Sequence, residues 1–168
     1  MGRMSRRHGF DRPFSCFQVL SWIIAVFIVI SFSVTLCALL LQEGSEDSHY
    51  YSSFVCAVLY YMSFLAMVLT TIVVTASNPT DPTVALERLS KLAKNNKMAE
   101  YKFNERDYSF HCDICDTHVL KNTKHCQRCN RCSYEFDHHC VWVSNDIGLH
   151  NYAAFIRMLM AAFSTLVI

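Results

Sequence analysis

Three blocks of apolar residues are separated by polar segments along the 168-residue chain. Residues 14–41 and 54–77 contain no charged side chain. Each is longer than the roughly 20 residues that a helix needs to cross a bilayer. A signal peptide is the alternative for the first block, but its apolar region would be shorter and a small-residue cleavage site would follow. Pro79 and Pro82 end the second block, because proline lacks the backbone donor. We therefore predict two transmembrane helices, over residues 14–41 and 54–77.

A third apolar block begins at Tyr152 and is interrupted by Arg157. At about 17 residues it is at the lower limit for a span. We predict that residues 152–168 are the start of a third transmembrane helix. We also expect that the sequence is a fragment or a truncated product that ends inside this helix.

Basic residues are distributed unevenly around these blocks. The N-terminal tail, residues 1–13, carries four arginines, the loop over residues 42–53 carries no Lys or Arg, and the linker over residues 78–107 is again basic. Because cytoplasmic segments are enriched in basic residues, we predict a cytosolic tail, a lumenal loop and a cytosolic linker. Within the linker, residues 84–97 have the periodicity of a short amphipathic helix. This helix either packs on its own domain or lies on anionic lipid.

The composition narrows the classes of function. The chain is 52% hydrophobic and 17% charged, with a formal net charge of +1. It is too apolar for an ordinary small soluble domain. A nucleic-acid binder usually needs a concentrated basic surface, so we expect no nucleic-acid partner. We predict an α-helical integral membrane protein with a small cytosolic cysteine-rich domain between the second and third helices.

Six of the nine cysteines lie between Cys112 and Cys140. From Cys112 the spacing is C-x2-C, ten residues, C-x2-C-x2-C, and seven residues to Cys140. Paired C-x2-C motifs bring two sulfurs to one tetrahedral ion and indicate zinc. A disulfide framework is the alternative, but the neighbouring histidines and the predicted cytosolic location favour metal. Spacing alone leaves open whether Cys140 is the last ligand and which histidines bind. The candidates are His111, His118, His125, His138 and His139.

Cys140 ends the tetrad Asp137-His138-His139-Cys140. A nucleophilic cysteine must be a thiolate, and a neighbouring histidine oriented by a carboxylate supplies the base. Asp137, His138 and Cys140 provide these three parts in order, and Trp142 and an apolar block follow. The tetrad therefore favours a nucleophilic Cys140 over a Cys140 that only binds zinc.

The sequence over residues 112–155 resembles the cysteine-rich domain of DHHC palmitoyltransferases. The two preceding apolar blocks are also similar to that family, as is Asp81-Pro82, where the family often has Asp-Pro-Gly. We place the domain at residues 108–151. The resemblance is carried by Cys112, Cys115, His125, Cys126, Cys129, Cys132, Asp137, His138, His139, Cys140, Trp142, Asn145, Gly148, Asn151 and Phe155.

This resemblance implies a protein-cysteine S-palmitoyltransferase with two zinc ions. Cys140 would accept the acyl group of palmitoyl-CoA and pass it to a substrate protein cysteine at the cytosolic membrane face. His138 would be the base and Asp137 its orienting partner. The expected location is the Golgi or the endoplasmic reticulum. One zinc would bind Cys112, Cys115, His125 and Cys132, and the other Cys126, Cys129, His139 and Asp146.

Some positions depart from the family pattern. Asp146 stands where the family usually has cysteine; aspartate binds zinc through oxygen at about 2.0–2.2 Å, in a weaker or differently shaped site. Val141 replaces the usual proline after the tetrad, and Val119-Leu120 replaces a basic-Pro pair. The family has four spans, and this chain supplies two and part of a third.

Two other functions compete with acyl transfer. The first is a catalytically impaired, membrane-anchored zinc module that binds partners, which Asp146 and the missing spans would suit. The second is a zinc-ribbon nucleic-acid binder, which the apolar blocks disfavour. The intact tetrad favours the acyltransferase. Basic residues of the domain either attract CoA phosphates or only make it soluble; they are Lys121, Lys124, Arg128 and Arg131.

Overall fold

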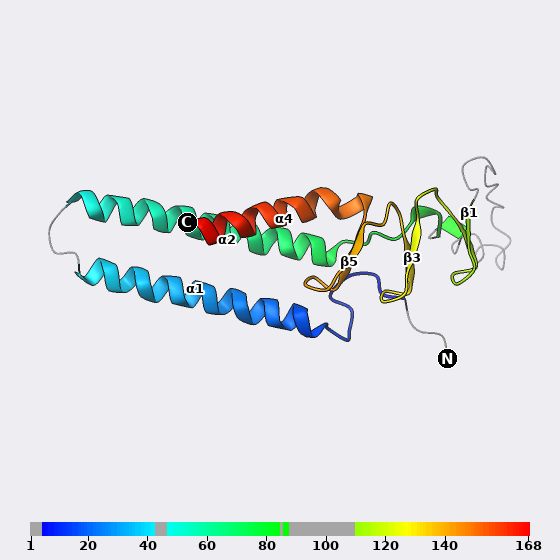
Figure 1. Cartoon of the computed structure of the whole chain (residues 1–168), viewed down its shortest axis with the longest axis horizontal. Coiled ribbons are helices and arrows are strands. Elements are labelled where there is room, and N and C mark those ends of the chain that lie inside the picture. Colours follow the sequence, from blue (N-terminus) through cyan, green and yellow to red (C-terminus); the bar gives the residue numbers. More distant parts are fainter. Residues whose placement is uncertain (1–4, 43–46, 85, 88–109) are drawn as a thin grey trace.

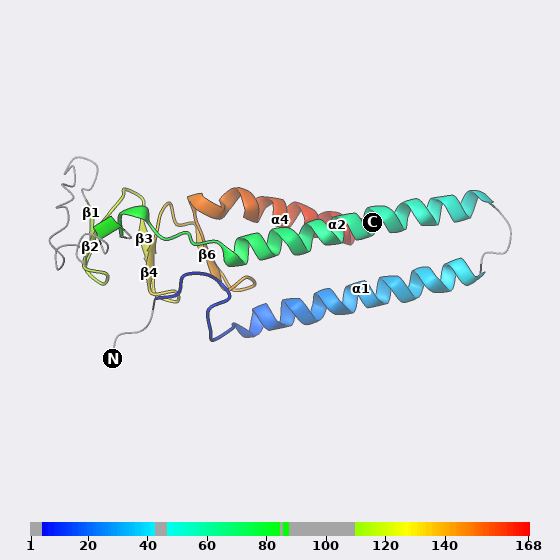
Figure 2. The same cartoon turned by 180° about the vertical axis from the view of Figure 1, so that it is seen from behind.

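The computed structural model describes residues 5–42, 47–84, 86–87 and 110–168. Three long helices and six short strands form an elongated molecule, with the helices at one end and the strands at the other (Figures 1 and 2). The predicted amphipathic helix over residues 84–97 lies largely outside the described residues.

Two long apolar helices occupy the first two apolar blocks. Helix α1 spans Cys16–Gln42 and helix α2 spans Asp47–Ala76. The stretches Cys16–Ala38 and Tyr51–Ala76 are long and apolar enough to cross a membrane. Large apolar side chains on their surfaces are exposed; Phe27, for example, is 69% exposed. Water contact costs about 25 cal/mol per Å² of such surface, whereas lipid would cover it. Both predicted membrane helices are therefore present as candidate spans, and their orientation stays a prediction.

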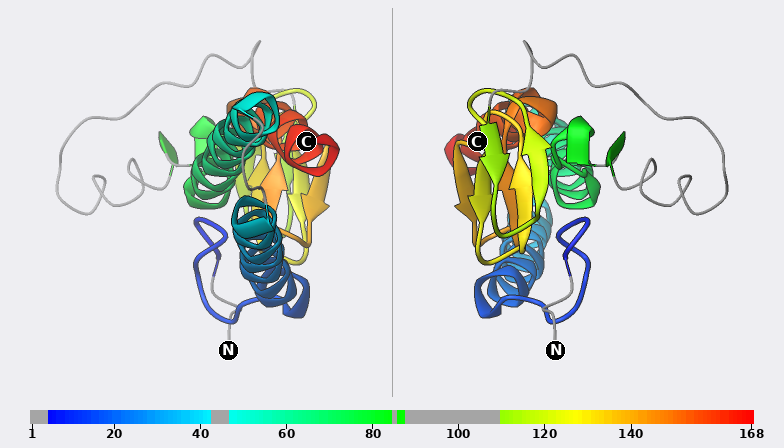
Figure 3. Two further views of the ribbon diagram at one scale, coloured as in Figure 1. Left: turned by 90° about the vertical axis from the view of Figure 1, so that its left-hand side faces the viewer. Right: turned by 90° about the vertical axis from the view of Figure 1, so that its right-hand side faces the viewer.

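Helix α4 spans Leu149–Val167 and covers the third apolar block. It lies along α2, and Figure 3 shows the two helices side by side when viewed along the long axis of the molecule. The Asn151 side chain accepts a hydrogen bond from the backbone N–H of Gly148 at 3.0 Å and so caps the start of α4. Near its other end, the Thr165 hydroxyl lies 3.2 Å from that of Ser63 on α2. That α4 crosses a membrane stays a prediction.

The cysteine-rich segment folds as three antiparallel two-stranded hairpins. They follow one another along the long axis of the molecule, with hairpin 3 next to the helices and hairpin 1 at the far end (Figure 1). Hairpin 1 is β1 (Phe110–Cys112) with β2 (Thr117–Val119), hairpin 2 is β3 (Lys124–Cys126) with β4 (Arg131–Ser133), and hairpin 3 is β5 (His138–Cys140) with β6 (Asn145–Ile147).

The three hairpins repeat one pattern every fourteen residues. Their first strands start at residues 110, 124 and 138, and each of these strands ends in His-Cys. The turn residues Asp116, Asn130 and Ser144 take the same left-handed conformation, with φ between 49° and 51°. Asp and Asn tolerate this conformation better than most residues. A repeated sequence thus builds a repeated structure, in which equivalent positions can be compared directly.

Asp81 joins the end of α2 to hairpins 1 and 2. One of its oxygens accepts hydrogen bonds from the backbone N–H and hydroxyl of Thr83, at 2.8 and 2.7 Å. The other accepts from the Leu120 N–H at 2.9 Å and the Thr123 hydroxyl at 2.6 Å. Its own N–H donates to the Cys132 carbonyl at 2.9 Å. This buried carboxylate is therefore fully satisfied and holds the hairpins at a fixed place beyond α2.

The N-terminal segment over residues 5–15, here called the N-terminal arm, packs against the hairpins. The Arg6 N–H donates to the Cys129 carbonyl at 2.9 Å, and the Gly9 N–H donates to the Thr75 carbonyl at 2.6 Å. A Cβ at Gly9 would overlap the Val143 carbonyl oxygen and lie 2.8 Å from Thr75 Cγ2. Glycine is thus required here by close packing. The arm fills the space between hairpin 3 and the end of α2.

Candidate active site and metal clusters

The first cluster joins hairpins 1 and 2. It contains the C-x2-C pair of hairpin 1 and a cross-strand pair of hairpin 2. From His125 Nδ1, the sulfurs of Cys112, Cys115 and Cys132 lie at 3.7, 3.3 and 3.8 Å. Four donors around one tetrahedral zinc are spaced by roughly 3.4–3.8 Å. These residues therefore fit a zinc ion, in the grouping that the family resemblance implied. The members are Cys112, Cys115, His125 and Cys132.

The second cluster joins hairpins 2 and 3 in the same way. His139 Nδ1 lies 3.7 and 3.4 Å from the sulfurs of Cys126 and Cys129. Asp146 Oδ1 lies 3.2 Å from Cys129 Sγ and 2.8 Å from His139 Nδ1. All four donor atoms lie within 4.8 Å of one another. Asp146 thus lies with the other three donors as a possible fourth ligand, and that it binds zinc stays a prediction of the family resemblance.

The hairpin repeat explains why His138 and His139 face different neighbours. Successive residues of a strand point to opposite faces, so His139 lies on one face of β5 while His138 and Cys140 share the other. His139 faces the second cluster. The His138 ring packs on Phe155 of α4, with the centroids 5.2 Å apart, and Cys140 is buried among Val74 and other residues at the helix ends. The structure therefore places the two histidines on opposite faces of β5, and their separate roles stay predictions.

Cys140 is one residue from the second cluster and belongs to neither cluster. Five of the six cysteines between residues 112 and 140 lie in the clusters. Cys140 stands at the repeat position of Cys112 and Cys126, but Val143 replaces the second cysteine of its C-x2-C pair. The Cys140 residue is 6% exposed. The Asp137 carboxylate lies 3.0 Å from His138 Nδ1, which leaves Nε2 of His138 free to act as a base if the ring carries its proton on Nδ1.

Comparison with known proteins assigns this arrangement to a family. Residues 103–168 match the family model described as DHHC palmitoyltransferase. The chain contains a DHHC palmitoyltransferase domain. The mouse palmitoyltransferase ZDHHC4 is 36% identical over 74 residues, which are 43% of this chain and 22% of that protein. The bovine palmitoyltransferase ZDHHC4 is 50% identical over 48 residues, or 29% of this chain and 14% of that protein.

A plant relative matches the same kind of domain. The Arabidopsis thaliana probable protein S-acyltransferase 20 is 37% identical over 75 residues, which are 45% of this chain and 10% of that protein. The matched segments thus span about a fifth or less of the length of these relatives.

In this DHHC domain, Asp146 divides its two oxygens between the metal cluster and hairpin 2. Oδ1 faces the cluster, while Oδ2 accepts hydrogen bonds from Arg131 Nε at 2.9 Å and from the Ser133 hydroxyl at 3.1 Å. Burial raises the pKa of Asp146, but the hydrogen bond from His139 and the charge of Arg131 outweigh it and hold this pKa well below its usual range. Asp146 therefore stays ionised and presents one oxygen to the cluster.

The pKa values of His139 and Cys126 are also shifted by contacts within the second cluster. Burial lowers the pKa of His139, but the hydrogen bond with Asp146 and the contact with Cys126 raise it to about 9. The hydrogen bond from Cys129 is the largest cause that lowers the pKa of Cys126, to about 5. A metal-free second cluster thus keeps one thiolate and one carboxylate beside a protonated histidine. A bound divalent cation would replace two protons, one on the histidine and one on the Cys129 thiol, and so keep the same net charge.

Arg131 is the residue of this site that sequence reasoning missed. Its guanidinium is 1% exposed, donates to Asn145 Oδ1, and donates to the carbonyls of Arg6 and Arg7 at 3.1 and 2.7 Å. Both interpretations of Arg131, as a contact for CoA phosphates and as a solubilising surface charge, are therefore wrong. No local sequence signal identifies this role, because the arm lies more than a hundred residues away in the chain.

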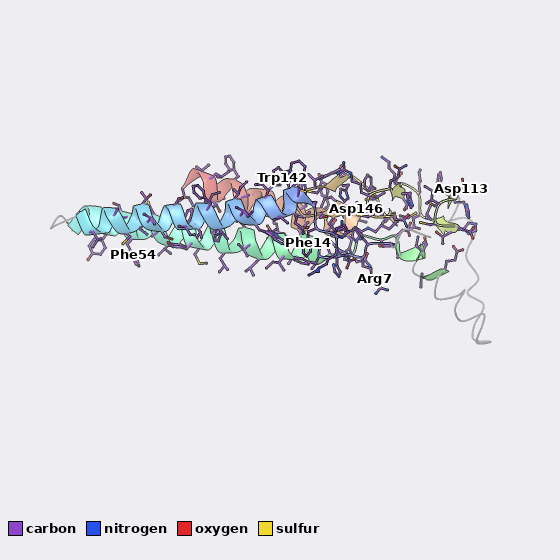
Figure 4. All side chains as sticks on the ribbon, turned by 90° about the horizontal axis from the view of Figure 1, so that it is seen from below. Arg7, Phe14, Phe54, Asp113, Trp142 and Asp146 are labelled. Carbon is purple, nitrogen blue, oxygen red and sulfur yellow. The ribbon has the colours of Figure 1, made fainter. Side chains whose placement is uncertain are left out.

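An apolar cavity of about 590 Å³ lies between α1 and α2 at the end nearest the hairpins. Trp142, which closely follows Cys140, lines it and packs edge-on against Phe17 with the ring centroids 5.4 Å apart. Figure 4 shows Trp142 and Phe14 at the junction of helices and hairpins, with Asp146 next to them. The cavity also contacts Phe10, Trp22, Ile28, Met67 and Ile72.

Proposed function

We propose that this protein is a protein-cysteine S-acyltransferase that uses Cys140 as its nucleophile and a long-chain acyl-CoA such as palmitoyl-CoA as donor. The observation that carries this proposal is that Cys140 occupies a ligand position of the hairpin repeat without belonging to a cluster. Its thiol is therefore left for chemistry, on the same face of β5 as His138, whose ring contacts the Asp137 carboxylate.

The proposed reaction has two thioester exchanges. In the first, His138 takes the proton of the Cys140 thiol, and the sulfur attacks the carbonyl carbon of the acyl-CoA. The bond between that carbon and the CoA sulfur breaks, and the proton passes to the departing CoA thiolate. In the second, a substrate cysteine loses its proton to His138 and attacks the acyl-Cys140 thioester, which restores the Cys140 thiol. Bond types are conserved, so positioning and thiol activation are the main requirements.

Zinc supports this chemistry from a distance in our proposal. The donors of the first and second clusters would hold one ion each, and a bound ion would fix the hairpins to one another by neutralising their thiolates. His139 would connect the fixed hairpins to Cys140. Because His139 precedes Cys140 on a three-residue strand, a fixed His139 also fixes the direction of the Cys140 side chain.

The apolar cavity supports a membrane location for the acyl chain. Trp142, two residues after Cys140 in the chain, lines one side of the cavity. Most of the other lining residues belong to the candidate membrane helices. An acyl chain would lie among these helices while the CoA group stays in water. We infer a cytosolic hairpin domain at the surface of the Golgi or endoplasmic reticulum, with cysteine-containing proteins at that surface as acyl acceptors.

Acyl transfer to Cys140 can be tested with an alkyne-labelled palmitoyl-CoA and the purified 168-residue protein in detergent. We expect hydroxylamine-sensitive label that Cys140→Ser abolishes and that the matched control Cys16→Ser retains, since Cys16 is an exposed cysteine outside both clusters. Label that persists in Cys140→Ser would contradict the assignment. Absence of label in the wild type with both clusters metallated would favour the alternative, a zinc module that binds partners without catalysis.

A further inference from the structure

The outer end of the hairpin stack presents another pair of metal-ligand residues, His111 and His118. They lie opposite each other across β1 and β2. In the fourteen-residue repeat, the equivalent cross-strand pairs of hairpins 2 and 3 belong to the first and second clusters. The same face of hairpin 1 points away from the stack, and its two histidine side chains are 41% and 54% exposed. The repeat therefore ends in a ligand pair that faces solvent.

The two imidazole rings lie in edge-to-face contact. Their centroids lie 5.2 Å apart with an interplanar angle of 75°. Two imidazoles bound to one tetrahedral zinc through nitrogens at about 2.0–2.1 Å have their centroids about 5 Å apart. Binding would require the side chains to rotate, because the donor atoms here do not already converge as those of the first and second clusters do.

Carboxylates surround this histidine pair. Glu87 Oε2 lies 3.8 Å from His118 Nδ1 and is held in place by the His118 backbone N–H at 2.8 Å. On the other side, Asp113 Oδ1 lies 3.1 Å from His111 Nδ1, and Asp116 Oδ1 lies 3.6 Å from His111 Nε2. A histidine that binds metal through one nitrogen commonly donates its other N–H to a carboxylate, as His111 can to Asp113. The carboxylates thus supply negative charge, a further ligand and an orienting partner.

We propose that His111, His118 and Glu87 form a third metal site, which binds Zn²⁺ or another divalent ion that prefers imidazole nitrogen. With three protein ligands, this site keeps an open coordination position, unlike the two closed clusters. It contains no thiolate and is exposed, so its ion exchanges with solvent more readily. Figure 4 shows Asp113, its orienting carboxylate, at the end of the molecule far from Trp142. The site is therefore independent of the proposed acyl transfer.

The test is a zinc titration of the purified 168-residue protein, with bound zinc counted by mass spectrometry after equilibrium dialysis. The wild type is expected to bind one equivalent more than the His111→Asn/His118→Asn variant, and this equivalent should be removed by a weak chelator that leaves the others. His118→Asn alone is the milder variant and should lose the same equivalent. With Co²⁺, the additional equivalent should add no sulfur-to-metal charge-transfer absorption, because no cysteine is involved.

The matched control is His150→Asn, which removes an exposed histidine of α4. It should bind as much zinc as the wild type. Equal zinc binding by the wild type and the double histidine variant would overturn the proposal, as would an extra equivalent that His150→Asn removes equally. Because the comparison counts only the difference between variants, it stands whether or not Cys140 proves to be acylated.

Discussion

The first and second clusters share one spacing but lie in different surroundings. The first has three cysteines and one histidine, is partly exposed at Cys112 and Cys115, and is joined to α2 through Asp81. The second replaces a cysteine by Asp146, is buried, and pairs that carboxylate with Arg131 inside the domain.

This difference suggests that the two clusters stabilise different parts of the domain. The first cluster joins hairpins 1 and 2, which carry none of the proposed catalytic residues. The second includes His139, which is next to Cys140 on β5. A substitution that disrupts the second cluster should therefore displace Cys140, whereas one that disrupts the first should change only the outer hairpins.

The largest effect is expected for Asp146→Ala. It removes a proposed ligand and leaves the buried Arg131 charge without its partner, which typically costs about 3–5 kcal/mol. Thermal unfolding and zinc content should show a strongly destabilised protein that has lost one equivalent. Lys121→Ala is the control, since this residue is exposed between hairpins 1 and 2, belongs to no cluster and should change stability by less than about 0.5 kcal/mol. Full zinc content in Asp146→Ala would show that the second cluster does not need this residue.

Arg131→Met tests the pairing from the other side. Alone, it removes the charged donor to Asp146 Oδ2, leaves the Ser133 hydroxyl as the remaining donor to that oxygen, and should cost about 3 kcal/mol. Combined with Asp146→Ala, the loss should fall short of the sum by about 1–3 kcal/mol, because the two residues interact directly. Unfolding curves of the four proteins measure this coupling. Strict additivity would mean that Arg131 acts through Asn145 and the N-terminal arm alone.

Asp81→Asn should loosen the first cluster and spare the second. The amide can accept fewer of the hydrogen bonds that the carboxylate receives, with an expected loss of about 1–3 kcal/mol. Cys112 and Cys115 should then react faster with an alkylating reagent, as peptide mass spectrometry would show, while Cys126 and Cys129 should not. If all four thiols were alkylated faster to the same extent, Asp81 would not stabilise the first cluster selectively.

A smaller effect is expected for Gly9→Ala. The added Cβ would overlap the Val143 carbonyl, so the N-terminal arm must shift, at a cost of about 1 kcal/mol. Limited proteolysis should cut the arm sooner than in the wild type. Arg12→Ala, at an exposed position of the same arm, should leave the cleavage rate unchanged. An unaltered rate in Gly9→Ala would mean that the arm is not held against hairpin 3.

The sequence predicted the parts of this site that depend on local spacing. Apolar run length predicted the two candidate membrane helices, and cysteine spacing with the family resemblance predicted the grouping around His125 and His139. The fourteen-residue repeat was not predicted from the sequence, although its signal is present, since His-Cys recurs at residues 111, 125 and 139. Arg131 and the N-terminal arm were not predictable, because their roles depend on contacts between distant parts of the chain.

The most direct test of the central claim is the zinc content of Cys140→Ser, measured beside its acyl labelling. If Cys140 is a nucleophile outside both clusters, this variant should keep the same number of tightly bound zinc ions as the wild type and lose its hydroxylamine-sensitive label. Loss of a zinc equivalent in Cys140→Ser would instead make Cys140 a metal ligand and contradict the account.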